Sequence, residues 1–515
     1  MNAIAVKNSV TLETLYEISE SSDDQVKDAY QTAREGFQAL KKTSVKERVD
    51  ALKKVRDAIY ENREAIIDRV VLETGKSRTD ALVSEAMGVL DYVDWLIASA
   101  PKILADQKAH TPIALMGKKS KIYHEALGVV LIIAPWNYPF NIAMVSILTA
   151  LAAGNSVVFK PSEITPLNGL IEEMMSASPL FKQSVNVVYG SGLTAQRLID
   201  QRPAKIFFTG SARTGKKILS QAANYLIPVE LELGGKDQMI VFDDVNIDRT
   251  VAGCLWGAMT NAGQSCTSVE RVYVQQSIYH SFVKKLKEEC AKLVVNAGDD
   301  GDADIGGITA DFQLDIIRQQ VEEATLAGAK VVAGGELLSE EMPFYLPTIV
   351  EGASADMTVM SQETFGPVLT ISPFNTEQEV IDESNNSDFG LSASVWSKDL
   401  KRADRVARAL EVGAVSINNV MLTEGNPALP FGGTKQSGFG RVKGAEGLLG
   451  MTQSKAILVD TQSAKIEANW YPYTRAKYQL FSQFIEALFG KGIQKWVKFA
   501  ISGIKLESES QKPRG

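Results

Sequence analysis

The chain has 515 residues, of which 45% are hydrophobic and 23% charged, and its formal net charge is −8. A chain of this length and composition can bury large cores, so we expect two or three lobes. The acidic balance gives no global attraction to nucleic acid, and we expect no nucleic-acid partner. The three cysteines and three histidines show neither CxxC pairs nor ligand clusters, which argues against a metal site and a disulfide framework.

The N-terminal stretch and the apolar runs bear on location. Residues 1–20 lack the basic start and continuous apolar core of a signal peptide. No run approaches the roughly 18 consecutive apolar residues of a membrane-spanning helix. The sequence therefore predicts a cytoplasmic protein.

Two helices are predicted near the N-terminus. Residues 22–42 carry apolar side chains at helical spacing. Ser44 and Glu47 form a capping-box start for a second helix that runs towards Gly75. We assign both helices to core packing and give them no chemistry.

From Gly128 onwards, predicted strands and helices alternate. The first block has helix-like stretches at 140–153 and 213–225, and its strands are predicted at 129–133, 156–160, 185–189, 205–208 and 229–233. Such alternation with short links predicts parallel strands covered by helices, a Rossmann-like layout. A second block, from 251 to about 427, is predicted to be the catalytic lobe, with strands at 330–333, 368–372 and 414–418. Gly234 and Gly235 then lie near the junction of the two lobes, a favoured place for a site.

Cys266 and Glu232 are the candidate catalytic pair. Cys266 lies in a run that reads NAGQSCT, and Glu232 opens the run ELGGK. A thiolate attacks carbonyl carbon well and leaves well, so it suits a covalent thioester or thiohemiacetal. A carboxylate that takes a proton from water suits hydrolysis of that intermediate.

Asn137 is the third candidate catalytic residue. It follows the predicted buried strand 129–133 in the run APWNYP, where α/β proteins place ligand contacts. Its amide could donate to an oxyanion formed when Cys266 attacks, a contact worth roughly 3 kcal/mol in other enzymes.

Taken together, these segments resemble the NAD(P)-dependent aldehyde dehydrogenase superfamily. The resemblance extends from about residue 22 to 460 and rests on seven runs in the family's order. Three of them are given above, and the other four are VVFKPSE at 157–163, FTGSARTG at 208–215, ETFGP at 363–367 and PFGGTKQSG at 430–438. It implies a Rossmann-like cofactor domain, an α/β catalytic domain and a small β oligomerisation element. We expect an NAD-binding domain at 1–116 and 130–233, a catalytic domain at 234–428, bridging segments at 117–129 and 429–463, and a C-terminal amphipathic extension at 464–515.

The dinucleotide-binding fingerprint GxGxxG is absent from the βα turns, and Gly210, Ser211 and Gly215 take its place. They follow a predicted strand and open a helix, whose free N–H groups suit a phosphate. The resemblance makes this turn the pyrophosphate site.

The other cofactor contacts are implied by the resemblance. Lys160 and Glu163 contact the adenosine ribose, with Trp136 and Ser162 beside them, and the nicotinamide half is held by Glu363 and Phe365. Because a carboxylate at 163 repels a 2′-phosphate, we expect NAD, with NADP possible.

The reaction implied is oxidation of an aldehyde to a carboxylic acid. Cys266 attacks, Asn137 and the Cys266 N–H hold the oxyanion, and Glu232 activates water. One departure is visible, since Asp237 and Gln238 follow Lys236 where the family often has a small residue and Pro. Two alternatives stay open, a thiol hydrolase without nucleotide and a non-catalytic protein on the same fold.

The C-terminal end is unusual for the family. Residues 456–460 resemble its oligomerisation strand, and we expect a homodimer or higher. Residues 470–489 are rich in aromatics, and apolar residues recur at helical spacing from 493 to 504, with Lys491, Lys495, Lys498 and Lys505 predicted on the opposite face. The pattern suits an anionic membrane surface. Three roles stay open: peripheral membrane contact, a cover over the substrate tunnel, or packing on the catalytic lobe or a partner subunit. The first two would serve an apolar aldehyde.

Overall fold

The structure is a computed structural model, and it describes residues 3–297, 301–339, 341–461, 464–493 and 495–512. Its chain divides into two compact units, one of residues 1–105 and 124–454 and one of residues 106–123 and 455–515. Among the described residues, no helix combines the length and apolar character needed to cross a membrane.

A six-stranded sheet forms the first half of the larger unit. Its order is β21 (Gly438–Phe439), β9 (Val229–Leu233), β8 (Lys205–Gly210), β5 (Val129–Ile133), β6 (Ser156–Lys160) and β7 (Val185–Val187). All neighbours pair in parallel except β21, which is antiparallel to β9. β5, β6 and β9 match the predicted strand limits, whereas β7 is shorter and β8 longer than predicted.

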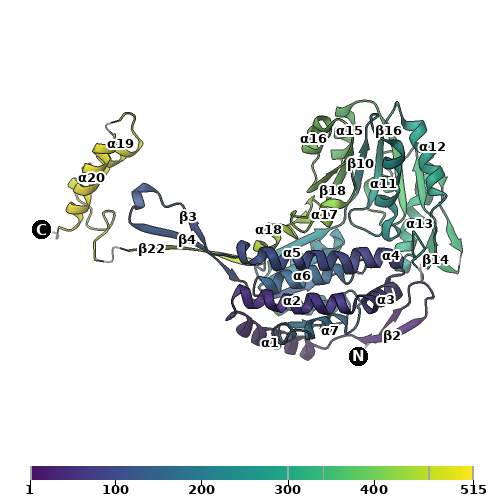
Figure 1. Ribbon diagram of the computed structural model, residues 1–515, viewed down its shortest axis with the longest axis horizontal. Helices are drawn as coiled ribbons and strands as arrows, with labels where there is room; N and C mark the ends of the chain where they lie inside the picture. The colour runs from purple at the N-terminus through teal and green to yellow at the C-terminus, as the bar shows by residue number, and fades with distance from the viewer. Residues whose placement is uncertain (1–2, 298–300, 340, 462–463, 494, 513–515) are drawn as a thin grey trace. The chain divides into compact units, whose positions relative to one another are not determined.

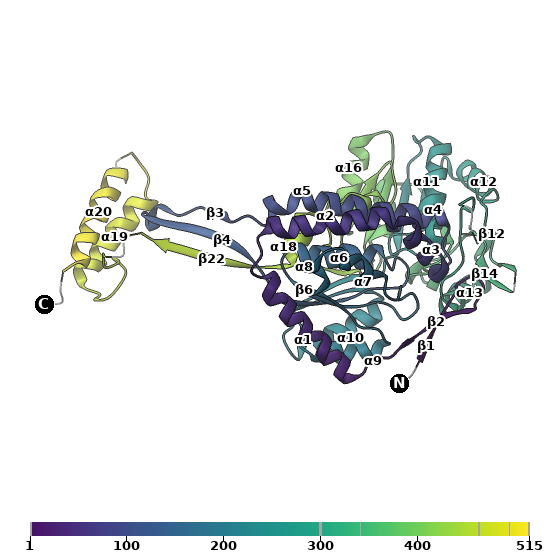
Figure 2. The same cartoon turned by 60° about the horizontal axis from the view of Figure 1, so that its bottom comes forward.

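Both faces of this sheet are covered because successive side chains of each strand point to opposite sides. Val130 and Ile132 face a core with helices α2 (Val45–Glu61), α3 (Arg63–Thr74), α5 (Gly88–Ile103), α6 (Asn141–Ala152) and α7 (Leu170–Ser176). Leu131 and Ile133 face a core with α1 (Asp23–Leu40), α9 (Gly192–Asp200) and α10 (Ala212–Ala223). Figures 1 and 2 show α2 and α5 running side by side.

The predicted N-terminal helices need one correction. Ser44 and Glu47 do form a capping box at the start of α2. The helix does not continue towards Gly75, because Asn62 leaves helical geometry (φ −98°, ψ 10°) and begins α3. After Gly75 the chain forms α4 (Arg78–Asp80) and a π-helical segment, η1 (Ala81–Met87), before α5.

A seven-stranded sheet forms the second half of the larger unit. Its order is β12 (Lys330–Ala333), β15 (Thr348–Glu351), β16 (Val368–Phe374), β11 (Val269–Gln275), β10 (Asp237–Val241), β18 (Ser392–Trp396) and β19 (Ala414–Ile417). Only β12 pairs antiparallel. One face packs on α11 (Ile247–Met259), α12 (Tyr279–Cys290) and α13 (Asp311–Leu326), and the other on α15 (Glu377–Asn385) and α16 (Leu400–Ala409), as Figure 1 shows. Short helices α17 (Leu422–Gly425) and α18 (Gly444–Gly450) follow β19.

Another sheet has three strands, two of which form an antiparallel pair. Its order is β22 (Thr452–Asp460), β4 (Lys118–Ala126) and β3 (Gln107–Ala109). β3 therefore extends the predicted bridging segment towards the N-terminus.

The C-terminal extension forms two helices, α19 (Arg475–Phe489) and α20 (Lys495–Ser510), that pack on each other. Phe484 and Phe499 meet at 4.8 Å between ring centroids, and Leu506 is buried. The predicted apolar stripe of α20 lies outside this contact, since Val497, Ile501 and Ile504 are 63%, 49% and 68% exposed. Both helices were correctly predicted, but α20 packs on α19 through side chains outside the predicted apolar stripe.

Candidate active site

A cavity of about 1360 Å³ opens at the carboxyl ends of the strands of the six-stranded sheet and reaches the second half of the unit. It exceeds the roughly 300–1,000 Å³ of a typical small-molecule pocket and so suits an extended ligand. Its lining includes every predicted site residue except Gly215, namely Trp136, Asn137, Lys160, Ser162, Glu163, Gly210, Ser211, Glu232, Cys266, Glu363 and Phe365.

The loop that presents Cys266 has unusual backbone geometry. Beyond α11, Asn261, Ala262 and Gly263 take φ values of 51°, 53° and 70°, in the left-handed region. Ala262 pays for this with backbone strain of the kind that gathers at functional sites. A Cβ at Gly263 would lie 2.0 Å from the carbonyl oxygen of Gly366, so only glycine permits this approach between the two loops. The turn leaves Cys266 three residues before β11, partly exposed in the cavity.

The Cys266 thiol is not ionised by its surroundings. Burial raises its pKa well above the usual value, and the negative charges of Glu424, Glu363 and Asp237 act in the same direction. The thiol must therefore lose its proton before it can attack as the thiolate.

Glu232, the fourth residue of β9, provides a candidate base. Its side chain is buried, and within the described part of the chain neither carboxylate oxygen has a hydrogen-bond partner. Burial, and then the charge of Glu230, raise its pKa well above the usual value. A buried acid with both oxygens unused, lining a cavity with a thiol, is a group placed to accept a proton.

Asn137 is held between the two halves of the site. Its side-chain Nδ2 donates to the main-chain carbonyl oxygen of Gln264 at 2.9 Å. Its main-chain carbonyl oxygen accepts from Lys76 Nζ at 2.8 Å and from Asn261 Nδ2 at 3.2 Å. An amide has two N–H donors, so one is left for a ligand as far as the described residues show.

The predicted adenosine contacts lie at the end of β6, and the predicted pyrophosphate contacts lie at the end of β8. Lys160 is buried, which lowers its pKa, and its Nζ donates to the Pro161 carbonyl at 2.9 Å and to Glu163 Oε2 at 3.3 Å. Ser211 caps α10 by accepting from the Thr214 N–H at 3.3 Å. Gly215 does not line the cavity. A Cβ there would lie 2.8 Å from Leu233 Cδ2, so its part is the close packing of α10 on β9.

The predicted nicotinamide contacts lie across the cavity. Glu363 Oε1 accepts from the Gly235 N–H at 3.1 Å, and burial, with the charge of Glu270, raises the Glu363 pKa to about 8. A Cβ at Gly234 would lie 2.2 Å from the Glu363 carboxylate, so glycine is needed there. The ring of Phe365 stands edge-on to Trp136 at 5.3 Å.

The departure at Asp237 and Gln238 leaves the catalytic groups in place. Asp237 is buried, and its Oδ1 accepts from the Ser392 N–H at 3.0 Å. Gln238 Oε1 accepts from Arg271 Nη2 at 2.9 Å. Both residues belong to β10 and tie it to neighbouring strands.

Sequence patterns did not point to several groups that adjoin the site. Lys76 contacts Asn137, as above, and Glu424 accepts from Thr267 Oγ1 at 3.0 Å. Both residues are distant from Cys266 in sequence and lie in segments without a recognisable ligand motif. Only the position of Lys76 directly after a glycine that ends a helix could have drawn attention.

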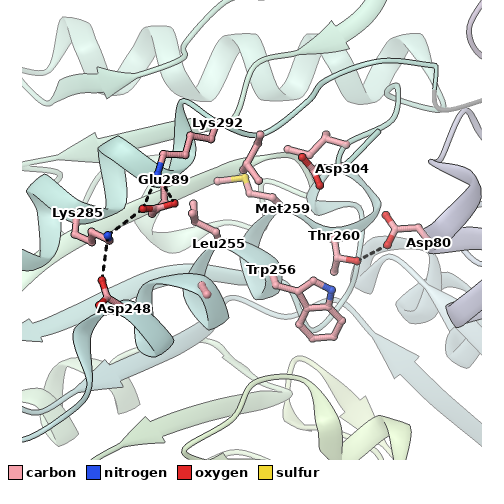
Figure 3. A pocket seen from close by; sticks show the side chains of 13 residues that line it. Asp80, Asp248, Leu255, Trp256, Met259, Thr260, Lys285, Glu289, Lys292 and Asp304 are labelled. Atoms are coloured by element: carbon pink, nitrogen blue, oxygen red, sulfur yellow. Dashed lines mark hydrogen bonds and ion pairs between the residues drawn. The ribbon is translucent and has the colours of Figure 1, made fainter. Parts of the chain in front are cut away.

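A second hollow of about 550 Å³ lies beside α11 and α12 (Figure 3). Its charged groups pair with one another, since Lys285 contacts Asp248 and Glu289 at 3.0 Å and Lys292 contacts Glu289 at 2.9 Å. No predicted catalytic residue lines it. Within the described residues, no cluster of metal-ligating side chains is found either.

The residues of the large cavity fit a dinucleotide. The N-terminus of α10 opens into it beside Ser211, the Glu163 carboxylate lies at the end of β6, and Gly234 leaves a gap that a side chain would fill. Helix N-termini favour phosphate, and an acid near a strand end suits ribose hydroxyls.

Comparisons with known proteins agree with this geometry. The model of the aldehyde dehydrogenase family matches residues 1–457. The 4,4'-diapolycopene aldehyde oxidase of a Methylomonas species is 41% identical over 449 residues, which are 87% of this chain and 84% of the relative.

Two solved structures cover 89% of this chain. The NAD+ complex of an aldehyde dehydrogenase from Bacillus cereus has a TM-score of 0.84 and 32% identity over 94% of its own length. An NADP-dependent enzyme from E. coli has a TM-score of 0.85 and 31% identity over 95% of its length. The predicted fold class is thereby confirmed. The chain belongs to the aldehyde dehydrogenase family and is an NAD(P)-dependent aldehyde dehydrogenase.

Proposed function

We propose that the enzyme oxidises an apolar aldehyde to the carboxylic acid through a thioester on Cys266. The observation that carries this proposal is the shared cavity, in which Cys266 and Asn137 lie with a buried Glu232 whose oxygens are unused among the described residues. A thiol hydrolase without nucleotide would not need the long cavity along the strand ends.

Cys266 Sγ forms the bond to the carbonyl carbon after the thiol proton has passed to water. The carbonyl oxygen becomes an alkoxide, which accepts from the free N–H of the Asn137 amide and from the Cys266 N–H. A nicotinamide dinucleotide, when bound, accepts the hydride that the carbon must lose. The thioester then remains on Cys266.

Glu232 completes the reaction as general base. Its carboxylate takes a proton from water, the resulting hydroxide attacks the thioester carbon, and the C–S bond breaks to release the acid and restore the thiol. Burial favours this role because it raises the pKa of the Glu232 carboxyl and so makes the carboxylate a stronger base.

The dinucleotide is held by the residues placed around the strand ends. Lys160 and Glu163 would contact the adenosine ribose with Trp136 and Ser162 nearby, Gly210 and Ser211 the pyrophosphate, and Glu363 and Phe365 the nicotinamide half. The Glu163 carboxylate favours NAD over NADP, because it repels a 2′-phosphate.

An apolar substrate is supported by the surface around the Cys266 loop. Three elements next to this loop expose apolar side chains. η1 directly follows Asp80, which accepts from Asn261 N, α11 leads into the loop, and α17 carries Glu424, which accepts from Thr267. The exposed residues are Leu82 and Val83 (43% each), Met87 (49%), Trp256 (47%) and Leu422 (50%). The Methylomonas relative bears the name of an oxidase of 4,4'-diapolycopene aldehyde.

The direct test is a panel of straight-chain, aromatic and small polar aldehydes with NAD and with NADP, followed by the absorbance of reduced cofactor. We expect the highest kcat/KM for long-chain or aromatic aldehydes with NAD, and none with Cys266→Ala. A preference for small polar aldehydes would refute the substrate class, and turnover of Cys266→Ala at a tenth of the wild-type rate would refute the nucleophile.

We further propose that the C-terminal extension rests on an anionic membrane surface. Its exposed aromatic and aliphatic side chains include Trp470, Tyr473, Phe489, Trp496 and Ile504, all more than half exposed. Lys491, Lys498 and Lys505 are exposed as well and recur every seven residues. This combination suits reversible binding to headgroups rather than a packed core.

We also propose an oligomeric state and a cellular location for the enzyme. Edge strand β22 exposes Ile457, Leu458 and Val459 (36%, 51% and 42%), and an exposed apolar edge is a template for pairing with a second copy. We therefore propose a homodimer or higher oligomer, testable by light scattering. A cytoplasmic location suits the three free cysteines, because a thiol nucleophile must stay reduced.

A further inference from the structure

Lys76 and Glu85 form a fully buried ion pair next to the Asn137 loop. The Nζ–Oε1 distance is 2.7 Å, and both side chains have no exposed surface. Taking two charges out of water is costly and is offset only when the remaining donors and acceptors are also satisfied. What those groups bond to therefore indicates what the pair does.

The remaining hydrogen bonds of the pair go to the segment that carries Asn137. Lys76 Nζ donates to the Asn137 carbonyl oxygen at 2.8 Å and lies 4.1 Å from the centroid of the Tyr138 ring. Glu85 Oε2 accepts from the N–H groups of Phe140 at 3.1 Å and Asn141 at 2.7 Å. The loop is thus held at Asn137 by the cation and at the start of α6 by the anion.

The same stretch of chain also holds the loop of the nucleophile. Asp80 accepts from Thr260 Oγ1 at 2.9 Å, as Figure 3 shows, and from the Asn261 N–H at 2.8 Å. Asn261 Nδ2 in turn donates to the Gln264 carbonyl oxygen at 3.0 Å, the acceptor of the Asn137 amide. The Asn137 side chain is therefore fixed between two loops that are both tied to residues 76–85.

Local backbone geometry brings these groups together. Gly75 ends α3 with φ +72°, a left-handed conformation that turns the chain into Lys76. Glu85 lies in the π-helical segment η1, a rare conformation that is frequent at functional sites.

We propose that Lys76 and Glu85 are positioning residues for Asn137. By clamping its main-chain carbonyl and the first turn of α6, they set the direction in which the side-chain amide points beside Cys266. This inference rests on the oxyanion role proposed above for Asn137. A displacement of about 1 Å in such a group can cost about 100-fold in rate.

The test measures single-turnover formation of reduced cofactor, which reports on acylation alone. The variant Lys76→Met/Glu85→Gln removes both charges, so that no charge is left buried without its partner. We expect a rate about 100-fold lower than wild type, with NAD affinity within about twofold, because the pair lines no part of the cofactor cavity. An unchanged rate would overturn the proposal.

A double-mutant cycle separates positioning from a general structural effect. If the pair acts through Asn137, adding it to Asn137→Ala should slow the reaction by less than about twofold. A further loss of about 100-fold would show independent action and overturn the inference while leaving the role of Asn137 intact. A wild-type rate in Asn137→Ala alone would instead overturn the oxyanion role.

Two other variants guard against simple loss of folding. Lys76→Arg keeps the buried charge but replaces a compact ammonium with a planar fork, and a rate about tenfold lower is expected. Arg48→Met is the stability control, because Arg48 is buried and bonds the carbonyls of Ala152 and Thr43 at 2.9 and 2.8 Å without touching either loop. It should lower the melting temperature at an unchanged rate. A wild-type rate in Lys76→Arg, or the same rate loss in Arg48→Met, would overturn the assignment.

Discussion

At the scale of single residues, the site depends on groups that are buried and yet left free. Glu232 is the clearest case. It is buried in β9, next to the edge strand β21, and its side-chain oxygens have no hydrogen-bond partner among the described residues. An orphaned carboxylate costs stability, which is tolerable only where the oxygens are used by a ligand or by water. This is a physical reason to assign it to deacylation rather than to structure.

Glu232→Gln should therefore slow deacylation by about 100-fold or more and leave hydride transfer much less affected. Rapid mixing should show a burst of reduced cofactor followed by a slow steady state. Gln matches the volume of Glu, so the cavity and cofactor binding should be unchanged. Loss of the burst at normal cofactor affinity would place Glu232 in the acylation step instead.

Asp237 carries a pH dependence of stability. Burial raises its pKa to about 8, against hydrogen bonds from Ser392 that lower it. Because the folded-state pKa lies above the unfolded one, the native protein binds more protons than the unfolded chain between about pH 4 and 8. The stability that Asp237 contributes is thus complete below about pH 4 and is lost as the pH rises through 8, by at most about 1.4 kcal/mol per pH unit.

Asp237→Asn removes this titration. The melting temperature of the variant relative to wild type should rise steadily between about pH 5 and pH 8, and Ser392→Ala should not show this trend. A difference independent of pH would mean that Asp237 does not titrate in this range.

The sequence identified residues that carry chemistry in compact runs, such as Cys266 and Glu232, because their neighbours are close along the chain. It could not identify Lys76, Glu85 or Asp80. Their contacts to the segments that carry Asn137 and Asn261 span between 55 and 181 residues of chain, and no local pattern records them. Gly215 shows the converse limit, since a glycine in a phosphate-like run proved to be needed for helix–strand packing.

At the scale of elements, the parallel strands of the six-stranded sheet were easier to predict than those of the seven-stranded sheet, where β10, β11, β15 and β18 were not among the predicted strands. β5 is a short apolar run and β6 has an apolar centre, and burial on both faces agrees with their local preference, whereas β9 alternates Glu with Leu and is buried as well. The break at Asn62 was missed because both flanking stretches favour helix, and only packing decides that α2 and α3 diverge. In α20, composition alone could not reveal which apolar side chains meet α19, because the packed Phe499 and Leu506 lie outside the predicted stripe.

The exposed face of α20 gives a prediction about that element. Ile501→Glu should lower co-sedimentation with anionic vesicles by about tenfold, because a half-exposed aliphatic side chain is replaced by a charge. Gln31→Glu adds the same charge to an exposed position of α1 and should leave vesicle binding unchanged. Equal effects of the two variants would mean that only net charge matters.

At the scale of the whole molecule, charge is unevenly divided. Residues 461–515 hold nine Lys and Arg against four Glu, a net charge of +5 in a chain whose total is −8. The remainder therefore carries −13 and is repelled by an anionic surface, while the extension is attracted to it. This asymmetry favours an orientation in which only the extension meets the headgroups.

A chain ending at Asp460 should therefore lose vesicle binding altogether, and added salt should weaken binding of the full chain, because the Debye length falls from about 10 Å at 0.1 M to about 3 Å at 1 M. Activity on short, water-soluble aldehydes should stay within about twofold, since the cavity and its lining lie outside the removed segment. Activity on long-chain aldehydes delivered in anionic vesicles should drop about tenfold, as the local concentration of membrane-held substrate is lost. If the shortened chain kept its vesicle binding and its chain-length preference, the extension would be a packing or subunit-contact element. A loss confined to long-chain activity in solution, with vesicle binding intact, would instead favour a cover over the substrate entrance.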